Sequence, residues 1–523
     1  MSFRTLLLLY LSGLILPSIV SLLQSKPGYL DSDYYFAGGL QLAQGKGFVE
    51  PYLWNYLDGT TTLPHPSHTY WMPLASIIAA IGMRLTGDFD YASARLGFII
   101  LAAIVPPITH TLALALTRRK NLAMISAVLS IFYVYHAPFL GVTDNFGIYM
   151  VFGGLFFLAM SCQQECRGGV ILNLFLGVFA GFLSLARTDG LLWLAMALMV
   201  VALRHPASLE RKPFLQGILK EGILVLLGFL IVMGPWYWRN ITVFNSIVAP
   251  GGSRVLWLDN YDQTFIYPPE SLNMDYFKSL GWKEILSDRL WALKLNLQSG
   301  FAAHGSIILF PFILVGVFAT WGDARVKLAA IAWVFLFVVM TLVFPFAGAR
   351  GAFFHAGAAL QPMWWSLAPL GLDSMLDFLR RRGLGNDGTK VIFHSAMMLF
   401  VITLTVFVVY LRLFALGWGE GEDRYPMVES ALIQKGIKTE DIVIVRNAPG
   451  YYLETGRSAI SIPYGGESAI VEVSRVFGAE YLVLEPEAAI EPLQNLFQTS
   501  GDLAEFNYLG EVDGIRLYQI NTE

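Results

Sequence analysis

The chain has 523 residues, of which 55% are hydrophobic and 14% are charged, and its mean hydropathy is +0.56. A water-soluble protein of this length cannot bury so much apolar surface, so the composition excludes a soluble globular protein and predicts a polytopic membrane protein. The formal net charge of -4 is small and argues against a nucleic-acid partner.

The first apolar run covers residues 3–23 and has Arg4 close to its start. A cleaved signal peptide is the alternative interpretation, but the run is long enough to span a bilayer and no small-residue cleavage site follows it. We therefore expect an uncleaved helix with the N-terminus in the cytoplasm, because Arg4 on that side directs the following loop to the outer face.

The external loop, residues 24–94, opens with an acidic and aromatic segment, Tyr29–Tyr35, that carries Asp31 and Asp33. Acids this close to a bilayer are costly unless they are paired, solvated or used. One interpretation is structural: Asp31 caps a short amphipathic helix predicted over Asp33–Gln44. The other makes Asp31 or Asp33 the general base of an enzyme, because a carboxylate in a partly dry pocket can have a suitable pKa.

Ten further apolar runs predict membrane-spanning helices, at residues 94–116, 122–135, 146–160, 170–185, 191–203, 218–238, 302–321, 328–344, 354–370 and 391–413. The basic segments 118–120, 204–220, 325–327 and 380–382 fall on one side of the membrane only if the short apolar stretch 69–84 does not cross. Placing all four basic segments on the cytoplasmic side predicts about eleven transmembrane helices in residues 1–415. The stretch 69–84 is then a juxtamembrane helix on the outer face.

The composition changes at Gly417, and residues 416–523 are predicted to form a small α/β domain on the extracytoplasmic side. Strands are expected at 441–446, 459–462 and 481–484, helices at 427–435, 467–477 and 488–497, and a hairpin between 506–509 and 514–520. The domain has no glycine-rich phosphate loop and no metal-ligand spacing, so we assign it no chemistry.

The other candidate chemical residues lie in segments predicted to face outward. His65 and His68 suit phosphate binding or an acid partner, with solvated loop residues as the structural alternative. Asp144 either caps the following helix or belongs to a site. His355 follows a glycine-rich turn that carries Arg350, where the small residues either allow a substrate to approach the backbone or simply form a turn.

Two further arginines are predicted at the outer face, against the positive-inside trend. Arg187 lies in a very short turn, where its partner is either Asp189 or the phosphate of a lipid-linked substrate. Arg239 follows an aromatic belt, which either needs no function beyond the membrane interface or places Arg239 against a phosphate. Together the acids, histidines and arginines on one face favour a transferase that uses an anionic lipid substrate.

The order of these segments resembles that of the polytopic glycosyltransferases of the GT-C fold, in the branch of protein O-mannosyltransferases and lipid A aminoarabinose transferases. The residues that carry the resemblance, over roughly 1–415, are Asp31-Ser32-Asp33-Tyr34-Tyr35, Gly45-Lys46-Gly47-Phe48, Trp71-Met72-Pro73-Leu74, Thr143-Asp144-Asn145, Leu185-Ala186-Arg187-Thr188-Asp189-Gly190 and Pro235-Trp236-Tyr237-Trp238-Arg239-Asn240.

The resemblance implies inverting transfer of a sugar from a polyprenyl-phosphate donor to a glycan, lipid or protein acceptor at the external face of the plasma membrane. It implies that Asp31 is the catalytic acid and Tyr35 its aromatic companion. Ser32 replaces the second acid of the family pattern, so Asp33 stays an alternative base. No cofactor is implied with certainty, and a divalent metal bound by the acids is possible. The alternative function is a membrane transporter or a flippase for lipid-linked sugars.

Overall fold

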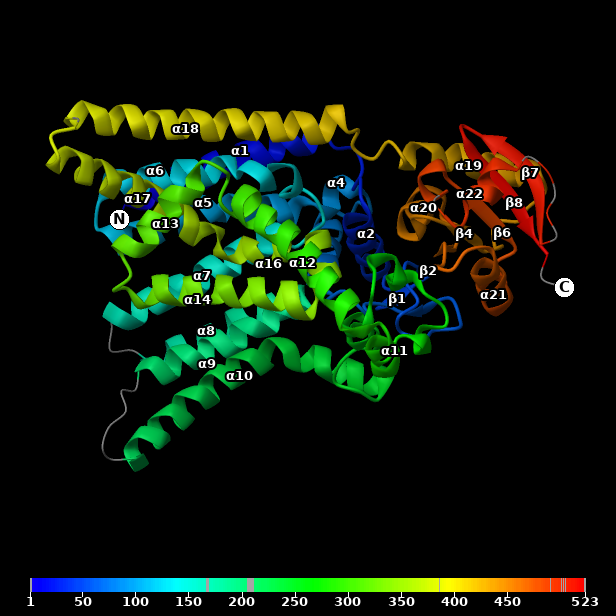
Figure 1. Ribbon diagram of the computed structural model, residues 1–523, viewed down its shortest axis with the longest axis horizontal. Helices are drawn as coiled ribbons and strands as arrows, with labels where there is room; N and C mark the ends of the chain where they lie inside the picture. Colours follow the sequence, from blue (N-terminus) through cyan, green and yellow to red (C-terminus); the bar gives the residue numbers. More distant parts are fainter. Residues whose placement is uncertain are drawn as a thin grey trace.

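The computed structural model describes residues 2–165, 169–204, 211–384, 386–489, 491–499, 501, 503 and 505–521. Figure 1 shows a large helical bundle joined to a small α/β domain, with the N-terminus in the bundle and the C-terminus at the far end of the small domain. The long helix α18 runs along one edge of the bundle and leads directly into the small domain.

Helices lie in all eleven apolar runs that predict spans. They are α1 (Phe3–Leu22), α5 (Leu96–Thr117), α6 (Lys120–Phe132), α7 (Phe146–Glu165), α8 (Gly169–Ala186), α9 (Leu191–Arg204), α10 (Arg211–Phe244), α13 (Leu309–Ala319), α14 (Ala324–Val338), α17 (Gln361–Arg381) and α18 (Asp387–Tyr410). Among the described residues, five helical segments are long and apolar enough to cross a membrane, or six if a bent pair counts as one span. The multi-pass membrane protein is confirmed, while the count of eleven spans and the orientation of the termini stay predictions.

Small residues bring the helices of the bundle close together. A Cβ added at Gly177 of α8 would lie 1.9 Å from the carbonyl oxygen of Val225, and one at Gly228 of α10 would lie 2.1 Å from that of Leu174. Without a hydrophobic drive between helices in lipid, such close backbone packing is a main source of association.

Two short helices precede the second long one. α2 (Leu30–Ala43) begins three residues before the predicted start at Asp33, and α3 (Leu74–Thr86) follows Pro73 directly. With 13 residues, α3 is shorter than the roughly 20 residues that cross a bilayer, as expected for the stretch 69–84. It packs along α2, and α4 (Tyr91–Ala94) leads on to α5.

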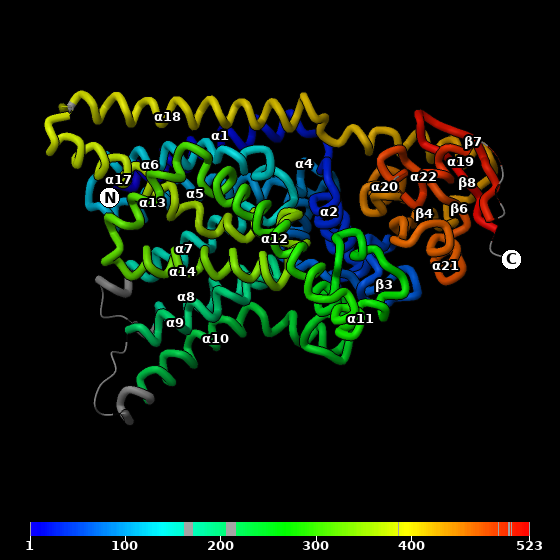
Figure 2. The backbone as a smooth tube through the Cα atoms, viewed as in Figure 1, coloured from blue at the N-terminus to red at the C-terminus, as the bar shows by residue number. Residues whose placement is uncertain are grey.

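Short helical turns and one longer helix, α12, occupy the segments between the long helices and the end of α18. They are η1 (Val134–Phe139), η2 (Thr188–Gly190), η3 (Pro250–Trp257), η4 (Tyr261–Phe265), η5 (Pro269–Ser271), α11 (Met274–Ser279), α12 (Gly281–Ser299), η6 (Gly300–His304), η7 (Val339–Val343), α15 (Pro345–Ala347), η8 (Gly348–Ala352), α16 (Phe353–Gly357), η9 (Ala358–Leu360) and η10 (Leu411–Ala415). Figure 2 shows the green segment with α11 beside the blue loop that carries β3. Arg254 Nη1 joins the two by donating to the carbonyl oxygen of Leu57 at 2.9 Å.

The small domain is built on a six-stranded sheet in the order β2-β5-β4-β6-β8-β7, parallel from β2 to β6 and antiparallel beyond. Its strands are β4 (Val443–Val445), β5 (Ala459–Ser461), β6 (Tyr481–Leu484), β7 (Phe506–Val512), β8 (Ile515–Ile520) and, from the external loop, β2 (Tyr52–Leu53). A separate pair joins β1 (Val49–Glu50) and β3 (His65–Pro66). The external loop therefore supplies an edge strand of the small domain.

The helices of the small domain are η11 (Glu422–Arg424), α19 (Tyr425–Gln434), α20 (Ala448–Thr455), α21 (Glu467–Phe477), η12 (Pro486–Ala488) and α22 (Gln494–Gln498). The prediction of one helix over 488–497 is wrong. Pro492 lies in the middle of that range, and proline removes a helical hydrogen bond and clashes with the preceding turn. The helix α20 was not predicted, because its Pro449 and Gly450 favour a turn.

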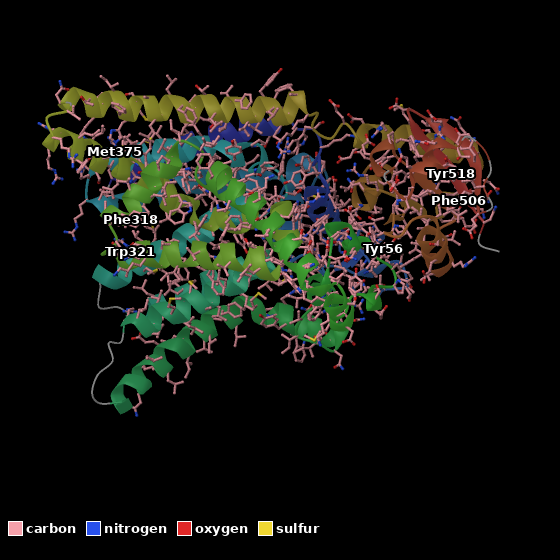
Figure 3. The ribbon with its side chains drawn as sticks, in the orientation of Figure 1. Tyr56, Phe318, Trp321, Met375, Phe506 and Tyr518 are labelled. Atoms are coloured by element: carbon pink, nitrogen blue, oxygen red, sulfur yellow. The ribbon has the colours of Figure 1, made fainter. Side chains whose placement is uncertain are left out.

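Tyr56 of the external loop fixes the bundle to the small domain. Figure 3 places it between the two parts, and its hydroxyl donates to the carbonyl oxygen of Ser461 in β5. Its ring lies 6.1 Å from that of Phe477 in α21. Phe318, Trp321 and Met375 mark the opposite end of the bundle in the same view.

Candidate active site

Asp31 and Asp33 lie in the first turns of α2, and Tyr29 is the residue that caps this helix. The interpretation of Asp31 as the N-cap is wrong, because the helix begins at Leu30. Successive residues of a helix turn by about 100°, so two residues apart point to nearly opposite sides. The two carboxyl groups therefore point into different surroundings.

Asp31 faces Asp144 and His355, and the ligand atoms of the three side chains lie within 4.8 Å of one another. We name these three residues the acidic cluster. His355 Nε2 lies 3.1 Å from Asp144 Oδ2, and the hydroxyl of Tyr29 donates to the same oxygen at 2.5 Å. The side chain of Asp144 is fully buried, whereas Asp31 and His355 are both partly exposed.

The two carboxyl groups of the acidic cluster differ in how readily they take up a proton. Burial and the neighbouring Asp144 raise the pKa of Asp31 to about 6, against the lowering effects of His355 and Arg187. Burial also opposes ionisation of Asp144, but the charge and hydrogen bond of His355 and the hydrogen bond from Tyr29 hold its pKa below the ordinary value. Asp144 is thus the fixed anion and Asp31 the group that exchanges a proton near neutral pH.

Polar contacts between α2 and the loop before α7 hold Asp31 in place. Ser32 and Thr143 join their hydroxyl groups at 2.9 Å, and Thr143 also donates to the carbonyl oxygen of Ser32 at 2.8 Å. Asn145 Nδ2 donates to the hydroxyl of Tyr35 at 2.8 Å. These buried bonds fix the first turn of α2 against the segment that carries Asp144.

Arg187 is oriented by its neighbour in the same turn. Its Nε and Nη2 both donate to Asp189 Oδ2, at 3.0 and 2.9 Å, and Tyr149 donates to Asp189 Oδ1 at 2.5 Å. Although burial opposes its charge, Asp189 raises the pKa of Arg187 further above its ordinary value. The structural partner proposed from the sequence is therefore present, and the guanidinium still acts electrostatically on Asp31, Tyr35 and His355.

Arg350 reaches the same region from η8. Its guanidinium lies over the ring of Tyr261, 5.5 Å from the centroid. The pKa of the Tyr261 hydroxyl is raised by burial, by Tyr70 and by Asp31, and Arg350 acts against these effects. Arg350 is exposed and forms no ion pair with any other residue in the described parts of the chain.

Asp33 points away from the acidic cluster, toward the small domain. Its Oδ2 accepts a hydrogen bond from Asn447 Nδ2 at 2.8 Å, and its carboxyl group faces that of Glu422. Lys26 lies in the same junction and pairs with Asp423 and Glu454, at 2.8 and 3.1 Å. Asp33 therefore ties α2 to residues 416–523.

His65 and His68 lie in a second group, the buried cluster, formed with Glu50 and Arg239. His68 is fully buried, and its ring nitrogens lie 2.8 Å from Ser67 Oγ and 3.0 Å from Ser76 Oγ. His65 lies 3.6 Å from Asp58 and 4.0 Å from Glu50. The interpretation of both histidines as solvated loop residues is wrong, because β1, β3 and α2 enclose them.

In the buried cluster, burial disfavours the charged forms of the two histidines and of Glu50. Burial and the nearby Arg239 lower the pKa of His68 to about 3, and burial raises the pKa of Glu50 well above its ordinary value. Arg239 Nη2 donates to the carbonyl oxygen of Ser67 at 2.7 Å, and its guanidinium lies 4.7 Å from the ring centroid of Trp236. The structure thus brings Asp31, Tyr35, Asp144, Arg187, Asp189, Arg350 and His355 into one region, and places His65, His68 and Arg239 in another.

Several residues of the site were not identified from the sequence. Tyr29, Tyr149 and Asn145 each hydrogen-bond a predicted site residue, and Tyr261 lies below Arg350. Asn145 directly follows Asp144 in the sequence, and this position next to a candidate residue is a local signal for it. Tyr149 and Tyr261 lack a local signal, because each meets the site only through packing.

The sequence matches no protein-family model and no curated protein. The structure is similar to that of the Archaeoglobus fulgidus oligosaccharyltransferase solved with zinc and sulfate, with a TM-score of 0.56 and 12% identity over 98% of this chain and 73% of that one. It is also similar to ArnT from Cupriavidus metallidurans bound to undecaprenyl phosphate, with a TM-score of 0.54 and 10% identity over 99% and 98% of the two chains.

A further similar structure is the archaeal oligosaccharyltransferase AglB from A. fulgidus with an inhibitory peptide and a dolichol-phosphate, with a TM-score of 0.50 and 13% identity over 98% and 74% of the two chains. Identities this low show the fold alone. The fold is that of the GT-C membrane glycosyltransferases, which confirms the expectation drawn from the order of the sequence segments.

Proposed function

We propose that this protein is an inverting glycosyltransferase that moves a sugar from a polyprenyl-phosphate-linked donor to an acceptor hydroxyl at the external face of the membrane. The observation that carries the proposal is the acidic cluster beside Arg187: a solvent-accessible carboxyl group, a fixed anion and a cation meet on this fold. The similar structures with undecaprenyl phosphate and dolichol-phosphate support the choice of a lipid-linked donor.

Asp31 is the general base in this mechanism. Its carboxylate accepts the proton of the acceptor hydroxyl while that oxygen attacks the anomeric carbon from the side opposite the phosphate. The bond from the anomeric carbon to the phosphate oxygen breaks, and the electron pair leaves with the lipid phosphate. General-base help of this kind contributes about 10²- to 10⁴-fold.

Arg187 stabilises the negative charge that develops on the leaving phosphate. The bidentate bond to Asp189 fixes the guanidinium before the donor arrives, so little reorganisation is needed during the reaction. Arg350, which is exposed above Tyr261, adds a second cation for the same phosphate. Tyr35, held by Asn145, lines the sugar side of Asp31.

The acidic cluster also fits a divalent cation. Two carboxylates and an imidazole whose ligand atoms lie within 4.8 Å of one another are a donor set that Zn²⁺ and Mn²⁺ accept. Asp144, His355 and one carboxylate oxygen of Asp31 would hold the ion, which when bound would neutralise phosphate charge as a Lewis acid, and the other oxygen of Asp31 would still accept the proton. The zinc in the similar oligosaccharyltransferase structure supports this assignment.

The test is turnover of a panel of polyprenyl-phosphate sugars by the purified full-length protein in lipid, with wild type beside Asp31→Asn. Cleavage of one donor by wild type and its loss in the variant would support the proposal and identify the donor class. Normal cleavage by Asp31→Asn would reject Asp31 as the base. Transbilayer movement of a lipid-linked sugar without cleavage would favour the flippase alternative.

A further inference from the structure

A cavity with a volume of about 320 Å³ lies beside the acidic cluster. Its walls come from η4, from α12 and from the segment α15–η8, and its lining includes Tyr261, Asp262, Asp288, Trp291 and Arg350. This volume falls at the lower end of the range for small-molecule sites, roughly 300–1,000 Å³. Of these lining residues, the proposed mechanism uses Arg350 alone.

Two aromatic side chains give the cavity apolar faces. Trp291 is 39% exposed, and its ring lies 5.8 Å from that of the buried Phe346, which fixes it from behind. Tyr261 is held from the other side by the guanidinium of Arg350. Partly exposed aromatic rings held rigidly in a polar cavity suit a ligand that has an apolar face and polar edges.

The polar lining carries two carboxyl groups, those of Asp262 and Asp288, and one guanidinium, that of Arg350, so its formal charge is negative. Asp288 Oδ2 is buried and forms no hydrogen bond within the described residues, and Arg289 Nη1 forms an ion pair with it at 3.6 Å. Asp262 is exposed at the same rim. Carboxylates accept hydrogen bonds only, so they match the hydroxyl donors of a sugar and repel an anionic ligand.

We propose that this cavity is a subsite for a neutral pyranose of the acceptor, stacked against Trp291 and Tyr261 and bound through its hydroxyl groups by Asp262 and Asp288. This inference rests on the proposed transferase function and assigns the acceptor as a glycan. The segment η8 connects the cavity to the acidic cluster, because His355 Nδ1 lies 3.0 Å from the carbonyl oxygen of Gly351, the residue that follows Arg350. A donor with a lipid tail enters from the bilayer, which leaves this loop-lined cavity for the acceptor.

The test measures binding of methyl glucoside, methyl mannoside and methyl galactoside to the full-length protein in nanodiscs by saturation-transfer-difference NMR. Wild type is expected to give a signal with at least one neutral glycoside and a weaker one with methyl glucuronide. Trp291→Ala and Asp288→Asn should lose that signal. Trp282→Ala is the matched control, because Trp282 lies on the same helix α12, is 70% exposed and does not line the cavity.

Kinetics add a second measurement once a donor is known. With the glycoside as acceptor, Trp291→Ala should raise KM about tenfold more than it lowers kcat, because stacking binds ground and transition state alike. Absence of any neutral-glycoside signal in wild type would overturn the subsite, and so would loss of the signal in Trp282→Ala alone or tighter binding of the glucuronide. Trp291-dependent binding of a peptide pool in place of sugars would reassign the cavity to a polypeptide acceptor.

The failure of the subsite is distinguishable from the failure of the transferase. If Asp31-dependent donor cleavage is present and no glycoside binds, the transferase stands and the subsite is rejected. If a glycoside binds through Trp291 but no donor is cleaved, the cavity is a sugar site without the proposed reaction.

Discussion

The acidic cluster and the buried cluster both combine carboxyl groups with histidine, but they differ in access and charge. In the acidic cluster, His355 and Asp144 form an ion-pair contact, and Asp31 and His355 are both partly exposed. In the buried cluster, the side chains of His65 and Glu50 are each 2% exposed and charge is suppressed. The difference teaches that acids and histidines close to a membrane interface become a candidate site only where packing leaves a charged group reachable.

The largest expected effect separates the two acids of α2. Asp31→Asn should lower sugar transfer by about 10²- to 10⁴-fold, because the amide cannot accept the acceptor proton. Asp33→Asn should stay within about threefold of wild type, because that side chain contacts Asn447 and the small domain. Donor turnover normalised to folded protein measures both, and equal losses in the two variants would contradict the separation.

The next effect compares Arg187, which lies beside the acidic cluster, with Arg239 of the buried cluster. Arg187→Gln should lower kcat by about 10²-fold, the usual loss when a group that stabilises developing charge is removed. Arg239→Gln should keep most of the turnover per folded protein but lower Tm by about 2–4 °C, because the guanidinium bonds Ser67 and packs on Trp236. A large kcat loss in Arg239→Gln with an unchanged Tm would move the phosphate site to the buried cluster.

Metal removal should affect the acidic cluster alone. Treatment with EDTA is expected to lower transfer at least about tenfold, and added Mn²⁺ or Zn²⁺ should restore it, because the cluster supplies three ligands. Asp144→Asn should shift the metal concentration needed for recovery upward, whereas His65→Gln should leave it unchanged. Full activity after chelation would assign the cluster to proton and phosphate handling without a cation.

The smallest expected effect is the pH dependence of stability from the buried cluster. The pKa of His68 falls from 6.5 in the unfolded chain to about 3 in the folded protein, so the unfolded chain binds the proton first as pH drops. Stability contributed by neutral His68 is thus complete above pH 6.5 and is lost progressively as pH falls toward 3.

Thermal unfolding at pH 7 and pH 5 tests this prediction. Wild type should lose more of its Tm between these two values than His68→Gln, which has no group to protonate. An identical Tm difference in the two proteins would show that other residues cause the acid sensitivity.

Sequence patterns located the long helices and most of the small domain. The apolar runs are local and long, and the helix predicted over 467–477 has the bounds of α21. Hydrophobic periodicity reports such elements because it depends on neighbours within a few turns. Hydrophobic periodicity did not predict β2, because its two residues join a sheet formed almost entirely by residues beyond 440.

The sequence by itself determined a multi-pass membrane protein with an acidic segment after its first helix and a small α/β domain, because composition and local periodicity are properties of the chain alone. Only the tertiary structure separated Asp31 from Asp33, joined Asp31 to Asp144 and His355, and enclosed His65 and His68. These outcomes depend on contacts between residues far apart in the chain, and such contacts also decide which groups keep their charge.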